Sequence, residues 1–153
     1  MKNHQIIFIK IKKLLSKQFG EDVNIYEDES HLSIGDSGIW ISMDEDELTI
    51  GYGVNHRHYH YEYDEIIGAV DELFNLLTRE KRITKYYKGK YQYKIKAEIQ
   101  DSNGEFKELS TSMTWLYPYW KKTGKKIEVI GSLIDYNEIK KEIAEIKILI
   151  KDS

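Results

Sequence analysis

Residues 39–52 read IWISMDEDELTIGY and predict a β-hairpin. Apolar side chains occupy every second position of residues 39–43, which is the pattern of a half-buried strand. Residues 48–52 form a second strand-like run, and four consecutive acids separate the two runs. Because neighbouring carboxylates repel one another, we expect residues 44–47 to be fully solvated at the tip of the hairpin.

A histidine-rich segment follows the hairpin, and residues 55–64 read NHRHYHYEYD. The strand of residues 48–52 can run on into this segment. Gly51 and Gly53 lie just before it, and glycines in strands often mark a bulge or a close backbone approach. Alternate side chains of a strand share a face. One face would therefore carry His56, His58, His60 and Glu62, and the other Arg57, Tyr59, Tyr61 and Tyr63.

Three segments have the apolar spacing of amphipathic helices. The first is residues 3–19, with Gly20 as its C-cap. The second is residues 65–78, with Asp64 as its N-cap, and the third follows Asn137 as its cap. The apolar stripes comprise Ile7, Ile11, Leu14, Leu15 and Phe19; Ile66, Val70, Leu73, Phe74 and Leu77; and Ile139, Ile143, Ile146 and Ile150.

The second half of the chain has the pattern of further antiparallel strands. Residues 85–87 and 91–99 flank a tight turn, and the Asn103-Gly104 pair favours a hairpin between residues 91–99 and 106–115. Residues 121–126 read as a basic loop before a strand over 127–130. We therefore expect residues 1–153 to form a single α+β domain, a largely antiparallel β-sheet with about three helices packed on one face.

Composition excludes several classes of protein. The chain has no cysteine, so disulfides and thiolate metal sites are excluded. No stretch approaches the roughly 20 apolar residues of a membrane span, and the apolar run before Lys10 is too short for a signal peptide. We expect a cytoplasmic protein without a membrane partner. Residues 1–78 carry a net charge of −9 and residues 79–153 a net charge of +6.

The histidines offer a candidate metal site, and zinc is the cofactor that fits them. His56 and His60 would lie about 13 Å apart at ~3.3 Å per residue, so at most two of the three histidines could share one ion. A third ligand would have to come from Glu62 across a bend or from His31 on a neighbouring strand. A metal-binding protein or metal-dependent enzyme that uses His56, His58 and His60 is therefore an alternative.

Other chemistry has weaker support in the sequence. The serines and threonines lie in no nucleophile-elbow or glycine-rich setting, and Gly51-Tyr52-Gly53 lacks the third glycine of a dinucleotide-binding loop. Residues 79–96 combine basic side chains with tyrosines, as single-strand binders do. Tyrosines at strand spacing are more often packing groups, and a pI near 6.0 argues against a dedicated nucleic-acid binder. We expect neither an enzyme nor a nucleic-acid partner.

Protein recognition fits the composition better. Twelve tyrosines and three tryptophans are many for 153 residues, and interface cores favour aromatic side chains. The acids that flank the histidine segment could steer a cationic partner. The predicted partner-binding residues are Asp44, Glu45, Asp46, Glu47, His56, His58, Tyr59, His60, Tyr61 and Glu62.

A family resemblance points the same way. The chain has an isoleucine–tryptophan strand, an acidic turn, the sequence LTIGYG over residues 48–53, a His-x-His-aromatic segment at residues 58–61, further acids and an amphipathic helix. Over about residues 38–78 it resembles small bacterial immunity proteins of polymorphic or contact-dependent toxin systems. The resemblance implies a cytoplasmic, non-enzymatic protein that neutralises a cognate toxin by binding it.

Overall fold

The computed structural model describes residues 1–26 and 28–152. The chain divides into two compact units, and we describe each by itself. Met1–Leu77 with Ile134–Ser153 form one, here called the α/β unit, and Thr78–Leu133 form the other, here called the strand unit. The single domain over residues 1–153 stays a prediction, and two compact units lie within it.

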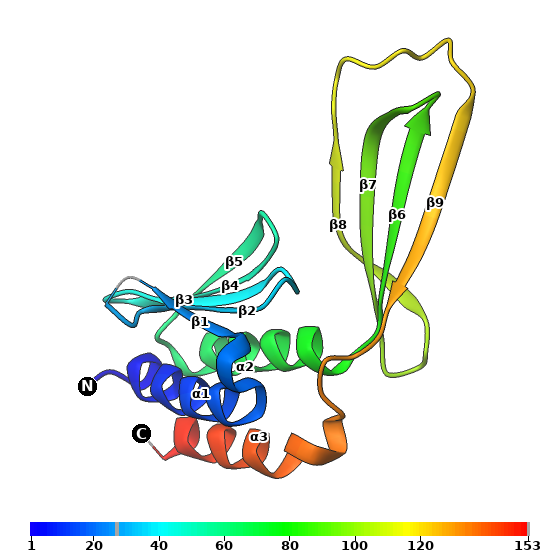
Figure 1. Cartoon of the computed structure of the whole chain (residues 1–153). Coiled ribbons are helices and arrows are strands. Elements are labelled where there is room, and N and C mark those ends of the chain that lie inside the picture. Colours follow the sequence, from blue (N-terminus) through cyan, green and yellow to red (C-terminus); the bar gives the residue numbers. More distant parts are fainter. Residues whose placement is uncertain (27, 153) are drawn as a thin grey trace. The chain divides into compact units, whose positions relative to one another are not determined.

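The α/β unit contains an antiparallel sheet in which each strand pairs with the next along the chain (Figure 1). A 3-10 turn, η1 (Gly20–Asp22), leads from the first helix into this sheet. Because every connection joins neighbouring strands, short turns suffice. The strands in order are β1 (Val23–Tyr26), β2 (His31–Ile34), β3 (Ile39–Met43), β4 (Glu47–Tyr52) and β5 (Asn55–His60).

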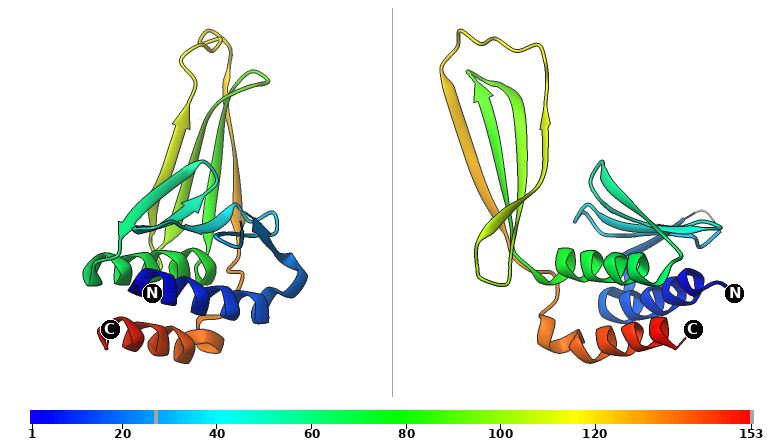
Figure 2. Two further views of the ribbon diagram at one scale, coloured as in Figure 1. Left: turned by 90° about the vertical axis from the view of Figure 1, so that its left-hand side faces the viewer. Right: turned by 180° about the vertical axis from the view of Figure 1, so that it is seen from behind.

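The helices of this unit all lie on one side of the sheet (Figure 2). They are α1 (Asn3–Phe19), α2 (Tyr63–Thr78) and α3 (Tyr136–Lys151). The helices α1 and α2 lie next to the sheet, and α3 packs against α1 on the far side from it. The predicted apolar stripes are buried in all three helices, except that Phe19 is only half-buried.

Alternation along the strands sends apolar side chains toward the helices and leaves the other face outward. Leu32, Ile41, Leu48 and Ile50 are almost completely buried, whereas Trp40, next to Ile41 on β3, is only half-buried. Burial of each such aliphatic side chain contributes about 1.5–3 kcal/mol. The core therefore lies between the sheet and the helices, and the opposite face of the sheet is available for contacts.

The strand β4 does not run on into the histidine segment, which is a correction to the sequence-based expectation. β4 ends at Tyr52, and β5 begins at Asn55 and returns antiparallel to it. The two residues between them form the turn. Gly53 has a φ of 61°, which a glycine adopts readily and which suits the first central position of a two-residue hairpin loop.

The strand unit is a second antiparallel sheet, in the order β8-β7-β6-β9. Its strands are β6 (Lys81–Lys88), β7 (Tyr91–Gln100), β8 (Phe106–Met113) and β9 (Thr123–Ile130). The predicted hairpins are present, but β6 begins earlier than expected. Residues 123–126, expected in a basic loop, belong to β9, because that strand pairs with β6 along its whole length.

Two predicted helix caps need correction. Asp64 lies inside the first turn of α2 and does not precede the helix. The N-cap of α3 is Asp135, whose carboxylate accepts a hydrogen bond from the Asn137 backbone N–H at 3.0 Å, so Asn137 is already inside the helix. The predicted turn between β7 and β8 is present: the Asp101 N–H donates to the Glu105 carbonyl at 2.7 Å, and the Gly104 N–H donates to the Asp101 carbonyl at 3.1 Å.

The α+β class with antiparallel sheets is confirmed, although the described residues form two sheets and not one. In the part of the chain that the structure covers, we find no helix with both the length and the apolar character to cross a membrane.

Candidate functional site

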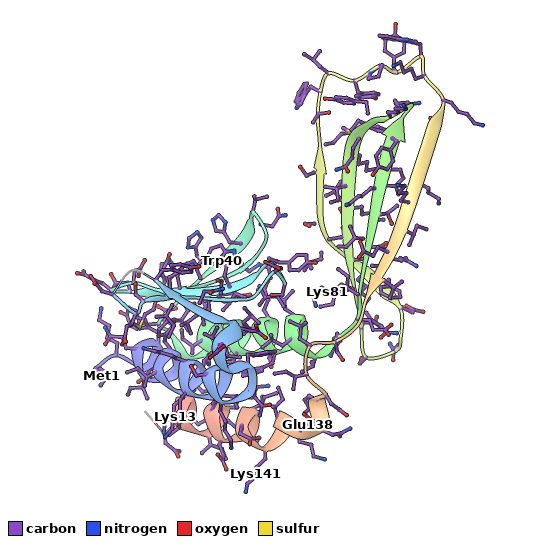
Figure 3. All side chains as sticks on the ribbon, in the orientation of Figure 1. Met1, Lys13, Trp40, Lys81, Glu138 and Lys141 are labelled. Carbon is purple, nitrogen blue, oxygen red and sulfur yellow. The ribbon has the colours of Figure 1, made fainter. Side chains whose placement is uncertain are left out.

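A row of aromatic and imidazole rings crosses the outward face of the α/β unit's sheet, from β1 to β5. Its members, here called the ring row, are Tyr26, His31, Trp40, His56 and His58. Successive ring centroids lie 5.9, 5.2, 5.8 and 5.0 Å apart. Trp40 stands on the sheet face opposite the helices (Figure 3). The row brings together predicted site residues from β5 with three side chains from other strands, Tyr26, His31 and Trp40.

Gly51 is what allows the ring row to be continuous. It lies opposite Trp40 on one side and opposite His56 on the other, so it stands between their strands. A Cβ atom at Gly51 would lie only 1.9 Å from Cε2 of Trp40, so the indole occupies the space above this glycine. The indole Nε1 also donates a hydrogen bond to the Gly53 carbonyl at 2.9 Å. Of the two alternatives left open for Gly51, a bulge or a close approach, the structure shows a close approach, and Trp40 is the group that approaches.

His58 is held by two neighbours on β4. Its Nδ1 lies 2.5 Å from Oε1 of Glu47 and 3.1 Å from the hydroxyl of Thr49. A carboxylate only accepts hydrogen bonds, so Nδ1 carries the proton in this pair. The side chain of His58 is 53% exposed. Its ring orientation is therefore set by the sheet while much of the ring remains open to a partner.

The acidic tip is exposed at residues 44–46, as expected, but Glu47 is half-buried and the tip has polar contacts. The Asp44 carboxylate accepts hydrogen bonds from the backbone N–H groups of Asp46 and Glu47, at 2.8 and 2.9 Å. Asp46 forms an ion pair with Lys2, and the hydrogen bond from this ammonium group lowers the pKa of Asp46. Lys2 also donates to the Glu45 carbonyl at 3.1 Å. The Asp44 carboxylate therefore stabilises the turn, and the Lys2 ammonium group compensates part of the negative charge of the tip.

The N-terminal helix supports this tip through a residue that the sequence did not single out. His4 is completely buried, and its Nε2 lies 3.0 Å from the Asp44 carbonyl. Its ring lies 6.3 Å from that of Tyr61, over which the Lys2 ammonium also sits at 5.1 Å. Tyr61 is thus partly covered by the N-terminus of α1. Lys2 and His4 precede the tip by about 40 residues, and no local pattern marks their contact with it.

The inward side of β5 belongs to the core. Tyr59 is 8% exposed, and its hydroxyl donates a hydrogen bond to the Glu72 carboxylate on α2. A Cβ atom at Gly68 would lie 3.2 Å from the Tyr59 ring, so this glycine gives the ring its space. Burial raises the pKa of Glu72, and Arg57 at 4.0 Å opposes that effect. The Tyr59 ring is therefore a packing group and not part of the exposed surface.

The end of the histidine segment departs from the predicted ladder. β5 stops at His60, whose backbone N–H donates to the Glu65 carboxylate at 2.7 Å. Glu62 lies beyond the strand, and its carbonyl accepts a hydrogen bond from the Ile66 N–H of α2. Glu62 is therefore the start of the helix connection and does not continue the face of His56 and His58.

β5 is the edge strand of its sheet in the described part of the chain. Tyr61 donates its N–H to the Asp46 carbonyl at 3.0 Å, so these two residues are a hydrogen-bonded pair. Hydrogen-bonded and non-hydrogen-bonded pairs alternate along an antiparallel ladder. His56 and His58 therefore belong to non-hydrogen-bonded pairs, and their backbone N–H and C=O groups face away from β4. An incoming strand could pair with these groups.

The arrangement gives little support to a metal centre. Among residues 1–26 and 28–152, no group of three or more His, Cys, Asp or Glu side chains is placed to hold a metal ion. The indole of Trp40 lies between His31 and His56 in the ring row, so His31 does not supply the third ligand. Glu62 is off the strand, as described above. Zinc binding stays a prediction, and the described residues do not form a set of ligands for it.

Comparisons with protein-family models, with curated proteins and with solved structures found no match. The resemblance of residues 38–78 to immunity proteins therefore stays a prediction, and any functional proposal rests on the geometry of this surface.

Proposed function

We propose that this chain is a non-enzymatic protein-binding module that recognises its partner through the histidine edge, defined as β5 with the adjoining side chain of Glu47. The observation that carries the proposal is the exposed edge strand. His56 and His58 direct backbone groups outward, and five of the six residues of β5 are exposed. Such an edge binds an extended partner segment by main-chain hydrogen bonds, and the neighbouring side chains provide specificity.

The charge of the α/β unit indicates the kind of partner. This unit has 10 basic and 20 acidic residues in its sequence, a net charge of −10. A field of this sign accelerates encounter with a cationic protein and disfavours acidic ones. The hydrogen-bonded pair of Glu47 and His58 then lies where such a partner would meet the edge. We propose that the partner is a toxin that this protein neutralises in the cytoplasm, as the resemblance of residues 38–78 implies.

A matched pair of variants tests the mode of binding. His58→Pro removes the outward N–H together with the imidazole, whereas His58→Ala removes the imidazole and keeps the N–H. Proline is tolerated at an edge position whose N–H faces solvent, so both variants should fold. We expect His58→Pro to bind the partner at least tenfold more weakly than His58→Ala, measured by calorimetry with candidate toxins encoded beside the gene.

Controls for folding accompany this comparison, and one result would refute strand addition. Circular dichroism should show the same helix and strand content in both variants. If His58→Pro is misfolded, His56→Pro and His56→Ala provide the same comparison at the next outward position. Equal affinities within a folded pair would refute strand addition at this edge.

A cellular experiment tests the identity of the partner. Bacteria that express the neighbouring toxin should survive when the full chain is co-expressed, and His58→Pro should reduce that protection. Failure of the wild-type chain to protect against any neighbouring candidate toxin, combined with absence of binding in vitro, would refute toxin neutralisation.

A further inference from the structure

The strand unit separates its charges along the length of its sheet. Residues 85–96 and 113–127 contain nine lysines, eight tyrosines or tryptophans and no acid. We call these two segments the lysine–aromatic end. The six acids of the strand unit all lie in the rest of its sequence: Glu80, Glu98, Asp101, Glu105, Glu108 and Glu128. The strand unit as a whole has a net charge of +7, from 13 basic and 6 acidic residues.

Strand pairing brings the two segments of the lysine–aromatic end together. Lys88 at the end of β6 lies opposite Thr123 at the start of β9, and its ammonium group donates to the threonine hydroxyl at 2.5 Å. The Gly89 N–H in the β6–β7 turn donates to the Lys122 carbonyl at 2.8 Å. The β6–β7 turn and the loop before β9 therefore form one continuous end of this sheet.

The loop between β8 and β9 exposes large apolar side chains at this end. Trp115 is 95% exposed, Leu116 87%, and Tyr119 and Trp120 73% each. Single exposed apolar residues are ordinary, but four within six residues form a patch, and such patches mark interaction sites. The loop is anchored on β7, because the Thr114 N–H at its base donates to the Tyr93 carbonyl at 2.9 Å, and Tyr117 stacks on the Tyr93 ring with 4.6 Å between ring centroids. The loop therefore presents its apolar side chains from a fixed base.

A hollow lined by lysines lies beside this loop. It has a volume of about 380 Å³ and is bounded by Tyr87, Gly89, Lys90, Gly124, Lys125 and Lys126. The Lys126 ammonium lies 5.9 Å from the centre of the Tyr87 ring. Several lysines next to the exposed backbone of two glycines suit the binding of a phosphate group, since lysine ammonium groups bind phosphate as point charges.

We propose that the lysine–aromatic end docks onto an anionic lipid surface. Tryptophan and tyrosine prefer the boundary between headgroups and acyl chains, because one part of each ring system is apolar and another is polar. Trp115 and Leu116 enter this boundary, and the surrounding lysines contact anionic headgroups, each adding about 1 kcal/mol near such a surface. Docking of this kind needs no spanning segment, but it departs from the expectation, drawn from the sequence, of a protein without a membrane partner.

A lipid surface explains this end better than a single-stranded nucleic acid does. Stacking of bases requires open aromatic faces. On the sheet, Tyr93 and Tyr117 stack on each other, and the Lys94 ammonium covers the ring of Tyr86 at 4.9 Å. The most exposed rings of this end are confined to the loop, at Trp115, Tyr119 and Trp120. Leu116 has no π face to stack on a base, yet it is among the most exposed side chains. Aliphatic exposure beside lysines is what a membrane boundary accommodates.

Vesicle sedimentation with the full chain tests the proposal. The probes are vesicles of phosphatidylcholine with and without about 30 mol % phosphatidylserine, a composition of roughly physiological charge. We expect partition onto the anionic vesicles only, falling as salt is raised, because screening weakens the lysine contribution. Trp115 emission should shift to shorter wavelength in a Trp40→Phe, Trp120→Phe background as its indole leaves water.

Matched variants separate the two contributions. Lys121→Gln with Lys122→Gln should weaken partition roughly 25-fold, since each lysine near the surface contributes about fivefold. Lys140→Gln with Lys141→Gln removes the same charge from exposed positions on α3 and should have little effect. Leu116→Ser should also weaken partition, whereas Val54→Ser, at a position 85% exposed in the β4–β5 turn, should not.

The same samples provide the contrary outcomes. No partition onto anionic vesicles, or equal losses in the two lysine pairs, would overturn the proposal. Fluorescence anisotropy of a labelled oligo-dT shows whether nucleic acid is the true ligand. The lipid proposal is also overturned if the chain binds oligo-dT, does not bind vesicles, and loses oligo-dT affinity in the Lys121→Gln, Lys122→Gln variant. None of these measurements involves a toxin. A negative result would therefore refute lipid docking without bearing on the function proposed for the histidine edge.

Discussion

Replacement of Gly51 by alanine should disrupt the ring row. The added Cβ would lie 1.9 Å from Cε2 of Trp40 and 2.3 Å from its Cζ2 and Nε1 atoms. Atoms cannot remain this close, and the backbone of β4 is held on both sides by β3 and β5. Since Trp40 lies on the outward face, the indole can relieve the clash by swinging away from the sheet.

That movement breaks three interactions of the indole, and their sum sets its free-energy cost. The hydrogen bond from Trp40 Nε1 to the Gly53 carbonyl contributes about 1 kcal/mol. The ring interactions with His31 and His56 contribute about 0.5–1.5 kcal/mol each. Alanine in a strand recovers roughly 0.5–1 kcal/mol relative to glycine. The net loss of unfolding free energy is about 2 kcal/mol, which lowers Tm by about 4–8 °C for a chain of this size.

The assay is urea unfolding followed by Trp40 fluorescence in a background of Trp115→Phe and Trp120→Phe, so that Trp40 is the single reporter. Gly124→Ala in β9 is the matched control, because a Cβ there has no neighbour within 4 Å, and it should be neutral or stabilising by up to about 1 kcal/mol.

A double-mutant cycle isolates the clash. In a Trp40→Ala background, read by circular dichroism, Gly51→Ala should become neutral or slightly stabilising. If Gly51→Ala costs as much without the indole as with it, the steric explanation is refuted.

Two further changes test local interactions. Asp135→Ala removes the N-cap of α3 and should cost about 1 kcal/mol of unfolding free energy, whereas Asn137→Ala, inside the helix, should cost less; urea unfolding of both checks this. Glu98 accepts two hydrogen bonds from Arg82, at 3.0 and 3.1 Å, and these lower its pKa. The ionised Glu98 therefore stabilises the fold above the ordinary glutamate pKa near 4.5, and this stabilisation is lost as pH falls through the lower folded pKa. Glu98→Gln should lower the free energy of unfolding at pH 7 and be indistinguishable from wild type at about pH 2. An equal loss of stability at both pH values would contradict a role for the Glu98 charge.

Local patterns predicted most of the elements. The stripes of α1, α2 and α3 were readable because burial of one helix face requires apolar residues three and four apart. The hairpin of β3 and β4 was readable because alternation and a polar turn coincide in residues 39–52. The break between β4 and β5 could not be predicted, because Gly53 and Val54 form a turn without the Asn-Gly or Asp-Gly pair that marks most two-residue hairpin loops.

The site depends on pairings between distant residues, which local patterns do not encode. Gly51 was recognised as the place of either a bulge or a close approach, and only the register of β3 against β4 shows that Trp40 lies over it. The histidine segment was recognised as exposed strand, and β5 is an exposed edge strand. The ion pair of Lys2 with Asp46 joins residues 44 positions apart, so no local pattern showed that the exposed Asp46 has a partner.

The division of the chain also determines an order of assembly during synthesis. The α/β unit takes residues from both sides of the strand unit, and α3 supplies Ile139, Ile143, Ile146 and Ile150 to its core. A ribosome therefore releases the whole strand unit before the last helix of the α/β unit exists. The strand unit can reach its final pairing first, while α1 waits for α3 with part of its apolar surface uncovered. Until then the nascent α/β unit is the part of the chain that most needs protection from aggregation.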